Sequence, residues 1–262
     1  MTGPVRCELA SGLLTLTLAE AESRNAFSAE LVGSLNEALR QAADEPEARV
    51  GLLLAEGPAF SAGMDMKRVA LDDRAQAARF ADALAEAYRR LLRLPIPLLC
   101  AVDGPAMGGA VGLALSADLI WMGPNGRFSF PETRVGVVPA LVSVPARRRL
   151  PVGRLSGLAL SGALLEPDDA RRIGMVDFIA AESAAAEARA FAANMIRERS
   201  DEAMRRTKAF LQAEGLADLD RQLEAARLEF CQAVQTAAAR RGVEAFRRKQ
   251  PLVWDESGTD PS

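Results

Sequence analysis

The chain has 262 residues, 49% of them hydrophobic and 26% charged, with a net charge of −3, which fits a globular protein with a large core. It contains no histidine, so Ser-His-Asp catalysis, Cys-His catalysis and zinc sites that use histidine are excluded. No stretch is long and apolar enough to cross a membrane, and the near-neutral charge gives no sign of nucleic-acid binding.

The first half of the chain alternates between apolar strands and amphipathic helices. The residues at 50–55 are continuously apolar, as in a strand buried on both faces, and Ser28 is expected to cap the helix that follows it. We predict strands at 5–10, 13–19, 50–55, 98–102 and 118–122, and helices at 28–43, 74–93 and 107–116. This order predicts an α/β layered fold with short connections.

The pattern becomes helical after about residue 145. We predict helices at 153–161, 167–173, 182–199, 201–214 and 217–249. The last of these carries an apolar stripe at helical spacing, formed by Leu219, Leu223, Ala226, Phe230 and Val234. We therefore expect a core over 1–195 and a helical C-terminal oligomerisation region over 196–262, which packs on its own core or on another subunit.

The cysteines and acidic residues indicate the compartment and the absence of a metal. Cys7, Cys100 and Cys231 are far apart and form no CxxC motif, so no disulfide framework is expected and a reducing cytoplasm is the natural location. No Asp/Glu cluster has the spacing of metal ligands, and no Rossmann fingerprint is present. We expect neither a metal nor a nicotinamide or flavin cofactor.

Two glycine-containing segments could bind an oxygen atom through backbone N–H groups. In the loop 58–65, Gly63 and its small neighbours allow a ligand to approach the main chain; the alternative is an ordinary turn capped by Asp65. In the segment 103–112, glycines open a helix whose free N–H groups and dipole favour a negatively charged oxygen. The alternative there is close packing of a small-residue helix against the sheet, and the segment is not a nucleotide fingerprint.

A third segment, 128–136, contains one carboxylate among apolar residues. Glu132 follows Pro131 and precedes Val135 and Val137, a setting that raises the pKa of a carboxyl group and suits it to acid/base work. The alternative is a surface glutamate at the start of a helix, where it complements the helix dipole.

Together and in this order, these segments resemble the enoyl-CoA hydratase/isomerase (crotonase) family, over nearly the whole chain. Six motifs carry the resemblance: RNA at 24–26, FSAGMD at 60–65, GPAMGGAVGLALSADL at 104–119, SFPETRVGVVPA at 129–140, LSG at 160–162 with IGMVD at 173–177, and AFRRKQP at 245–251. Each motif is weak alone, and the six in register make the resemblance specific.

The resemblance implies a fold, a substrate class and site residues. The fold is a spiral of ββα units with a helical C-terminal region, assembled as a homotrimer or a dimer of trimers, and the substrate is an acyl thioester of coenzyme A. The backbone N–H groups of Met64 and Gly109 would hold the thioester oxygen as it becomes an enolate, and Glu132 would be the acid/base. Coenzyme A is part of the substrate, so no separate cofactor is implied. The positions that match CoA-binding ones are Arg24, Ala26, Ala62, Asp65, Phe246 and Lys249, with Lys208 as a further basic position.

The sequence also departs from the two-glutamate hydratases of the family. Gly112 stands where their first catalytic glutamate lies, and PALVS at 139–143 replaces a glycine-rich motif. We expect an enoyl-CoA hydratase with a single acid/base; the alternatives are an enoyl-CoA isomerase, a polyketide-type dehydratase, and an acyl-CoA binding protein with little turnover. Glu86 and Tyr88 are further acid/base candidates, each of which could instead belong to a solvated or packing face.

Overall fold

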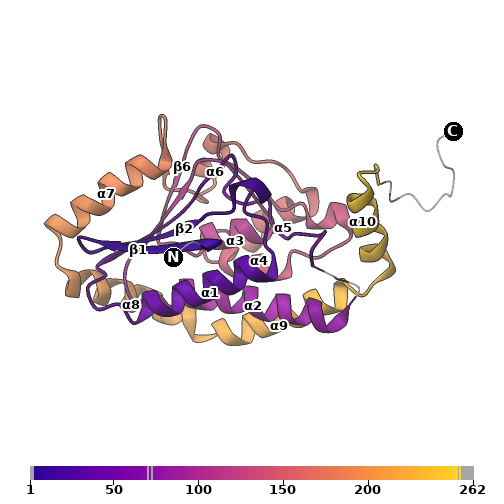
Figure 1. The fold of residues 1–262 in the computed structure, drawn as a ribbon, viewed down its shortest axis with the longest axis horizontal. Helices are drawn as coiled ribbons and strands as arrows, with labels where there is room; N and C mark the ends of the chain where they lie inside the picture. The colour runs from indigo at the N-terminus through magenta and orange to yellow at the C-terminus, as the bar shows by residue number, and fades with distance from the viewer. Residues whose placement is uncertain (1–2, 70, 72, 253, 255–262) are drawn as a thin grey trace.

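The computed structural model describes residues 3–69, 71, 73–252 and 254 (Figure 1). Six strands of this part of the chain form the main sheet. The first two strands are antiparallel and all the other neighbours are parallel. In sheet order, the strands are β1 (Val5–Ala10), β2 (Leu13–Leu18), β3 (Val50–Ala55), β4 (Leu98–Val102), β6 (Leu119–Met122) and β8 (Phe178–Ile179). All five predicted strands are confirmed, and β8 was not predicted.

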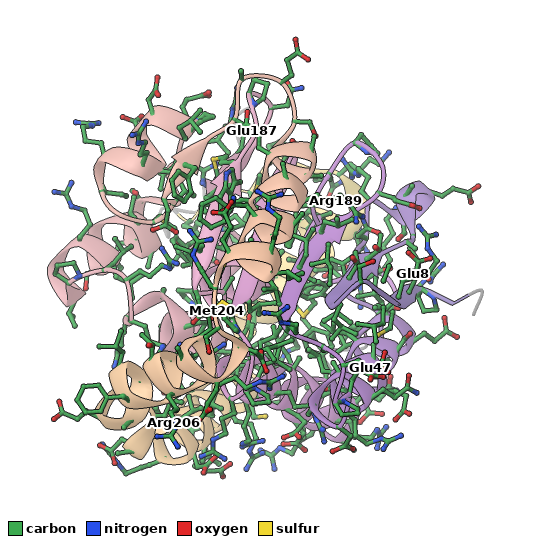
Figure 2. The ribbon with its side chains drawn as sticks, turned by 90° about the vertical axis from the view of Figure 1, so that its left-hand side faces the viewer. Glu8, Glu47, Glu187, Arg189, Met204 and Arg206 are labelled. Carbon is green, nitrogen blue, oxygen red and sulfur yellow. The ribbon has the colours of Figure 1, made fainter. Side chains whose placement is uncertain are left out.

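One face of this sheet is covered by α7 (Ala184–Glu198). Its alanines at 184, 188 and 192 are fully buried, and these small side chains bring the helix close to Leu52, Leu99 and Trp121 of the sheet. Figure 2 shows α7 lying across the strands, with Arg189 near β2, where its guanidinium donates to Thr15 Oγ1 over 3.4 Å.

The other face carries the larger part of the core. Here Ser28 caps the first helix as predicted, with its hydroxyl accepting from the Leu31 N–H at 3.1 Å. The helices that follow the early strands on this side are α1 (Ala29–Ala43), α2 (Arg74–Leu92) and α3 (Gly109–Leu115). They contribute leucines, alanines and aromatic rings to one continuous apolar cluster.

The C-terminal half is helical, as the sequence predicts. Its elements are α4 (Ala140–Ala146), α5 (Val152–Ser161), α6 (Pro167–Arg172), α8 (Asp201–Ala217), α9 (Leu219–Ala233) and α10 (Ala237–Arg248). The stripe on α9 faces inward, because Leu223 and Phe230 are buried in the same apolar cluster as α2 and α4. The boundary of the expected C-terminal region, between residues 195 and 196, lies inside α7, and residues 253 and 255–262 of that region lie outside the described residues.

The prediction of a single helix over 217–249 was wrong. The chain breaks after Val234, where the N–H groups of Gln235 and Thr236 bond back to carbonyls only three residues earlier. Thr236 then caps a new helix, with its hydroxyl accepting from the Ala239 N–H at 3.1 Å. Gln235 also leaves the helical path to donate to the Leu71 carbonyl at 3.0 Å.

In the described part of the chain, no helix has the length and apolar character needed to cross a membrane.

Candidate active site

A small second sheet places two of the predicted segments next to each other. It pairs β5 (Pro105–Met107) with β7 (Arg127–Ser129) in parallel, with Met107 opposite Ser129. The chain continues from β5 into the start of α3 and from β7 into a short 3-10 helix, η2 (Glu132–Val135). The Gly108 N–H donates to the Ser129 carbonyl at 2.9 Å, so this pairing reaches the two segments that carry Gly109 and Glu132.

The loop 60–65 is fixed on both sides by backbone hydrogen bonds. Phe27 brackets it, because its N–H donates to the Gly63 carbonyl at 2.7 Å and its carbonyl accepts from the Asp65 N–H at 3.1 Å. Gly63 has a φ of +80°, and a Cβ there would lie 2.6 Å from the Met107 carbonyl oxygen. The loop therefore needs glycine at 63, and its conformation orients the N–H group of Met64.

These segments meet at a cavity of about 310 Å³. Met64, Gly109 and Glu132 all line it. Within the described residues, neither the Met64 N–H nor the Gly109 N–H donates a hydrogen bond to another protein group. The rest of the wall is mainly apolar, including Phe27, Phe80, Leu84, Leu141, Val142 and Phe230. The cavity can therefore hold an apolar chain with a polar atom placed between two backbone donors.

Glu132 is the carboxylate of this cavity. Burial raises its pKa to about 7, and the Oε2 atom is out of contact with solvent and has no hydrogen-bond partner among the described residues. Oε1 faces Gly108, where a Cβ would lie 2.7 Å away. The setting predicted from the apolar neighbours is thus present: near neutral pH the group exists in both protonation states and can accept and return a proton.

The raised pKa of Glu132 makes stability depend on pH. Because the folded protein holds this proton more tightly than the unfolded chain, with its ordinary value of 4.5, the stabilisation is complete below that pH and is lost as pH rises through about 7. Between about pH 5 and about pH 8, we expect the stability of the Glu132→Gln variant relative to wild type to rise by about 2.5 kcal/mol. Urea unfolding of both proteins at the two pH values measures this, and parallel stability profiles would contradict it.

Of the predicted CoA-binding residues, Arg24, Ala62 and Phe246 line the cavity. Asp65 does not line it, and its Oδ1 accepts from the N–H groups of Lys67 and Arg68 at 3.0 and 3.1 Å, as a capping residue does. Ala26 and Lys249 are also outside the lining; Lys249 is exposed and ends α10 with a φ of 55°.

Asn25, inside the RNA motif, has a structural role that the sequence did not reveal. It is fully buried with a φ of 51°, a conformation that asparagine tolerates better than most residues. Its side-chain amide donates to the carbonyls of Glu56 and Ala59, at 2.9 and 3.1 Å, and so ties this turn to the loop before the cavity.

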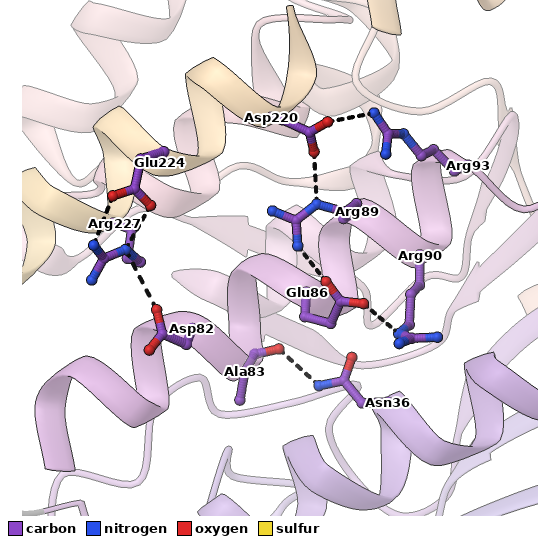
Figure 3. Close-up of polar contacts among 10 residues, drawn as sticks. All are labelled: Asn36, Asp82, Ala83, Glu86, Arg89, Arg90, Arg93, Asp220, Glu224 and Arg227. Atoms are coloured by element: carbon purple, nitrogen blue, oxygen red, sulfur yellow. Dashed lines mark hydrogen bonds and ion pairs between the residues drawn. The ribbon is translucent and has the colours of Figure 1, made fainter. Parts of the chain in front are cut away.

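Glu86 belongs to an ion-pair network between α2 and α9 and does not line the cavity (Figure 3). Its carboxylate pairs with Arg89 and Arg90, and Arg89 continues to Asp220 on α9 at 2.8 Å. The packing interpretation of Glu86 therefore fits the structure better than an acid/base role.

Lys208 also lies away from the cavity. Only 8% of its side chain is exposed, and its Nζ contacts Asp118 Oδ2 at 2.7 Å and the Ile96 carbonyl at 2.8 Å. The match to a basic CoA-binding position was therefore misleading. This amine connects α8 to the residues that precede β4 and β6, and it is not available to bind a phosphate.

Replacing Lys208 with methionine should lower stability without affecting substrate binding. The change leaves the largely buried Asp118 carboxylate without its cation, and we expect a loss of about 3 kcal/mol in the free energy of unfolding. Arg206→Met is the matched control on the same helix, since its pair with Glu202 is exposed and should cost less than about 1 kcal/mol. Urea unfolding gives both values; a large rise in KM for a CoA thioester in Lys208→Met alone would contradict this assignment.

Tyr88, the other acid/base candidate from the sequence, does not line the cavity. It is fully buried behind the cavity wall, and its hydroxyl donates to the Gly109 carbonyl at 2.7 Å, so the packing interpretation fits it as well. The segment 137–142 supplies much of the apolar wall, although its sequence shows only a run of small apolar residues. Within the described residues, no three Cys, Asp or Glu side chains gather in a group that could hold a metal ion.

Comparisons with known proteins identify the family of the chain. The family model for enoyl-CoA hydratase/isomerase matches residues 8–257. The chain is 32% identical to a Thermus thermophilus protein named as an enoyl-CoA hydratase, over 89% of this chain and 94% of that one. It is 28% identical to an enoyl-CoA isomerase/hydratase of Mycosarcoma maydis, over 93% of each chain.

A solved structure shows the same fold. The enoyl-CoA hydratase/isomerase from Mycobacterium paratuberculosis superposes with a TM-score of 0.87 at 26% identity, and the match covers 93% of this chain and 98% of that one. The chain has the crotonase fold and belongs to the enoyl-CoA hydratase/isomerase family.

Proposed function

We propose that the protein is an enoyl-CoA hydratase that adds water reversibly to a 2-enoyl thioester of coenzyme A. The observation that supports this most is the position of one buried carboxyl, with a pKa of about 7, in the same apolar cavity as two backbone N–H groups. Among the described residues, neither its Oε2 atom nor these N–H groups have a hydrogen-bond partner. The apolar wall suits the acyl chain, and the exposed Arg24 at the cavity suits the phosphates that the CoA portion carries.

In the proposed reaction, the Met64 and Gly109 N–H groups hold the thioester oxygen. The Glu132 carboxylate takes a proton from water as the water oxygen bonds to C3, and the electron pair of the double bond moves onto the thioester oxygen, which becomes an enolate. The protonated Glu132 then gives its proton to C2 as the enolate collapses. The proton balance closes on Glu132 and water, so the reaction needs no cofactor beyond the CoA that the substrate carries.

An enoyl-CoA isomerase is the second candidate, and a specific feature favours it. Gly112 provides no second carboxylate to hold the attacking water, whereas moving a proton between C2 and C4 needs only one base. The dehydratase alternative is the hydration reaction in reverse, and the same residues would serve it. A binding protein without turnover has no use for a buried, unpartnered carboxyl group beside the thioester.

The test is the ultraviolet absorbance of the conjugated enoyl group of crotonyl-CoA after purified protein is added. Loss of the signal supports hydration. If the signal is stable, a 3-enoyl-CoA is tested next, and a rising signal identifies an isomerase. No change with either thioester, over several chain lengths, would contradict both activities and favour the binding protein.

We also propose that the protein acts in the cytoplasm as a homotrimer or a dimer of trimers, with 196–262 contributing to the contacts. Large apolar side chains are exposed on two helices: Phe210 and Leu211 on α8 are 82% and 73% exposed, and Leu160 on α5 is 76% exposed. Sedimentation equilibrium measures the assembly, and a monomer at all concentrations would contradict it.

A further inference from the structure

The helix that begins at the cavity, α3, is held from behind by a tyrosine. Tyr88 projects from α2 and is fully buried, and its hydroxyl donates to the Gly109 carbonyl at 2.7 Å. Gly109 is the first residue of this helix and the source of one of the two N–H groups at the cavity. Tyr88 itself does not line the cavity, so any effect on a bound thioester must pass through Gly109.

Tyr88 also occupies the space next to Gly112, one turn further along α3. A Cβ at Gly112 would lie 2.5 Å from the Tyr88 hydroxyl oxygen and 2.6 Å from the adjacent ring carbon. Real Cβ atoms do not approach other atoms this closely, so no side chain fits at 112 while the ring is in place. The tyrosine and the glycine therefore form one packing unit.

The start of α3 has few other restraints. The residue that precedes the helix, Gly108, has no side chain to cap it, and two consecutive glycines give this backbone unusual freedom. Outside the hydrogen bonds of the helix itself, the backbone here is held in the described chain by the bonds from the Gly108 N–H to the Ser129 carbonyl and from the Val111 N–H to the Gly108 carbonyl, both 2.9 Å. The Tyr88 hydroxyl is the side-chain group that fixes the peptide following the Gly109 N–H.

We propose that Tyr88 is a positioning residue: through the Gly109 carbonyl it orients the Gly109 N–H toward the thioester oxygen, and its ring closes the site where a side chain at 112 would project. This inference rests on the proposed function, in which that N–H stabilises an enolate. Burial raises the pKa of the Tyr88 phenol well above its usual range, so the hydroxyl remains a donor across the working pH range.

The Tyr88→Phe variant removes the hydroxyl and keeps the ring. We expect kcat to fall about 10-fold with KM changed less than about twofold, because a misdirected N–H weakens binding of the enolate more than binding of the ground state. Ser116→Ala, at the C-cap of α3, is the matched control. The buried Ser116 hydroxyl donates to the Gly112 carbonyl at the same 2.7 Å, at the end of α3 away from the cavity, and kcat should change by less than about twofold.

A second measurement separates this role from turnover. Acetoacetyl-CoA forms an enolate that absorbs in the ultraviolet, so its absorbance when bound reports on the two N–H groups even if no enoyl thioester reacts. We expect wild type and Ser116→Ala to produce this signal and Tyr88→Phe to lose most of it. If Tyr88→Phe does not fold, as judged by circular dichroism, Gly112→Ala is used instead, because its methyl group displaces the hydroxyl from Gly109.

The outcomes are distinguishable. Loss of the enolate signal in Tyr88→Phe alone supports the positioning role even when crotonyl-CoA and 3-enoyl-CoA are both inert, which contradicts only the proposed activity. Wild-type kcat and enolate signal in Tyr88→Phe, or equal losses in Ser116→Ala, would overturn the positioning role and leave the hydratase proposal standing. Absence of the enolate signal in wild type would overturn both.

Discussion

The Glu132→Gln variant is expected to lose about 10³-fold in kcat while its affinity for a saturated acyl-CoA stays within about twofold of wild type. Glutamine has nearly the same shape as glutamic acid but can neither accept a proton from water nor return one to C2. The carboxyl it replaces has a pKa of about 7 and an unpartnered Oε2, so proton transfer is the property that is removed. Crotonyl-CoA turnover and calorimetric titration with butyryl-CoA measure the two quantities.

Glu86→Gln is the matched control for this change. Glu86 carries the same functional group but pairs with Arg89 and Arg90 outside the cavity, so turnover should remain within about twofold of wild type. Equal turnover in Glu132→Gln and wild type would show that another group moves the proton. A large loss of butyryl-CoA affinity in Glu132→Gln would show that the carboxyl serves binding.

The Gly108→Ala variant is expected to lose at least about 100-fold in activity and about 2 kcal/mol in stability. Gly108 has a φ of 55° and a ψ of −122°, a combination that only glycine adopts without strain. A methyl group there would also lie 2.7 Å from Glu132 Oε1 and push the carboxylate away from its position. The substitution therefore affects the acid/base and the start of α3 together. Crotonyl-CoA turnover and urea unfolding check both parts.

Gly33→Ala provides the comparison for Gly108→Ala. Gly33 lies on the exposed side of α1, and a Cβ there would meet no atom within 4 Å. This variant should keep full activity and gain about 0.5 to 1 kcal/mol, since alanine favours a helix more than glycine does. If Gly108→Ala were as active as Gly33→Ala, the backbone at 108 would not be under the constraint that we describe.

The strands and most helices could be predicted because their signals are local. The residues at 50–55 are apolar throughout, and Ser28 precedes an i, i+4 leucine pattern, so the sequence alone contains the evidence for each element. The helix break after Val234 is different. At the break, the Gln235 side chain donates to the Leu71 carbonyl, a partner 164 positions away, and the apolar stripe gives no sign of this contact.

The sequence allowed us to predict the backbone segments and the carboxylate of the candidate site, but not the apolar side chains that form the cavity wall. Gly63, Gly109 and Glu132 belong to short motifs, whereas the cavity wall joins Phe80, on α2, to Phe230, on α9. The packing of Tyr88 against Gly112 is equally non-local, because the Tyr88 ring on α2 fills the space that a side chain at 112 on α3 would occupy. At Lys208 the sequence was misleading. Its position matches a basic CoA-binding one, but the amine is paired with Asp118 instead.

The two N–H groups that hold the thioester oxygen in the proposed mechanism belong to the main chain, and this has a consequence for protein engineering. The identity of residue 64 matters little to them, whereas the backbone conformation set by Gly63 and Gly108 matters greatly. A mutagenesis library can therefore vary the wall positions, such as Leu84 and Leu141, to select new acyl groups while those glycines stay fixed. In the proposed mechanism, substrate range and enolate stabilisation depend on different residues, so directed evolution can change the first and keep the second.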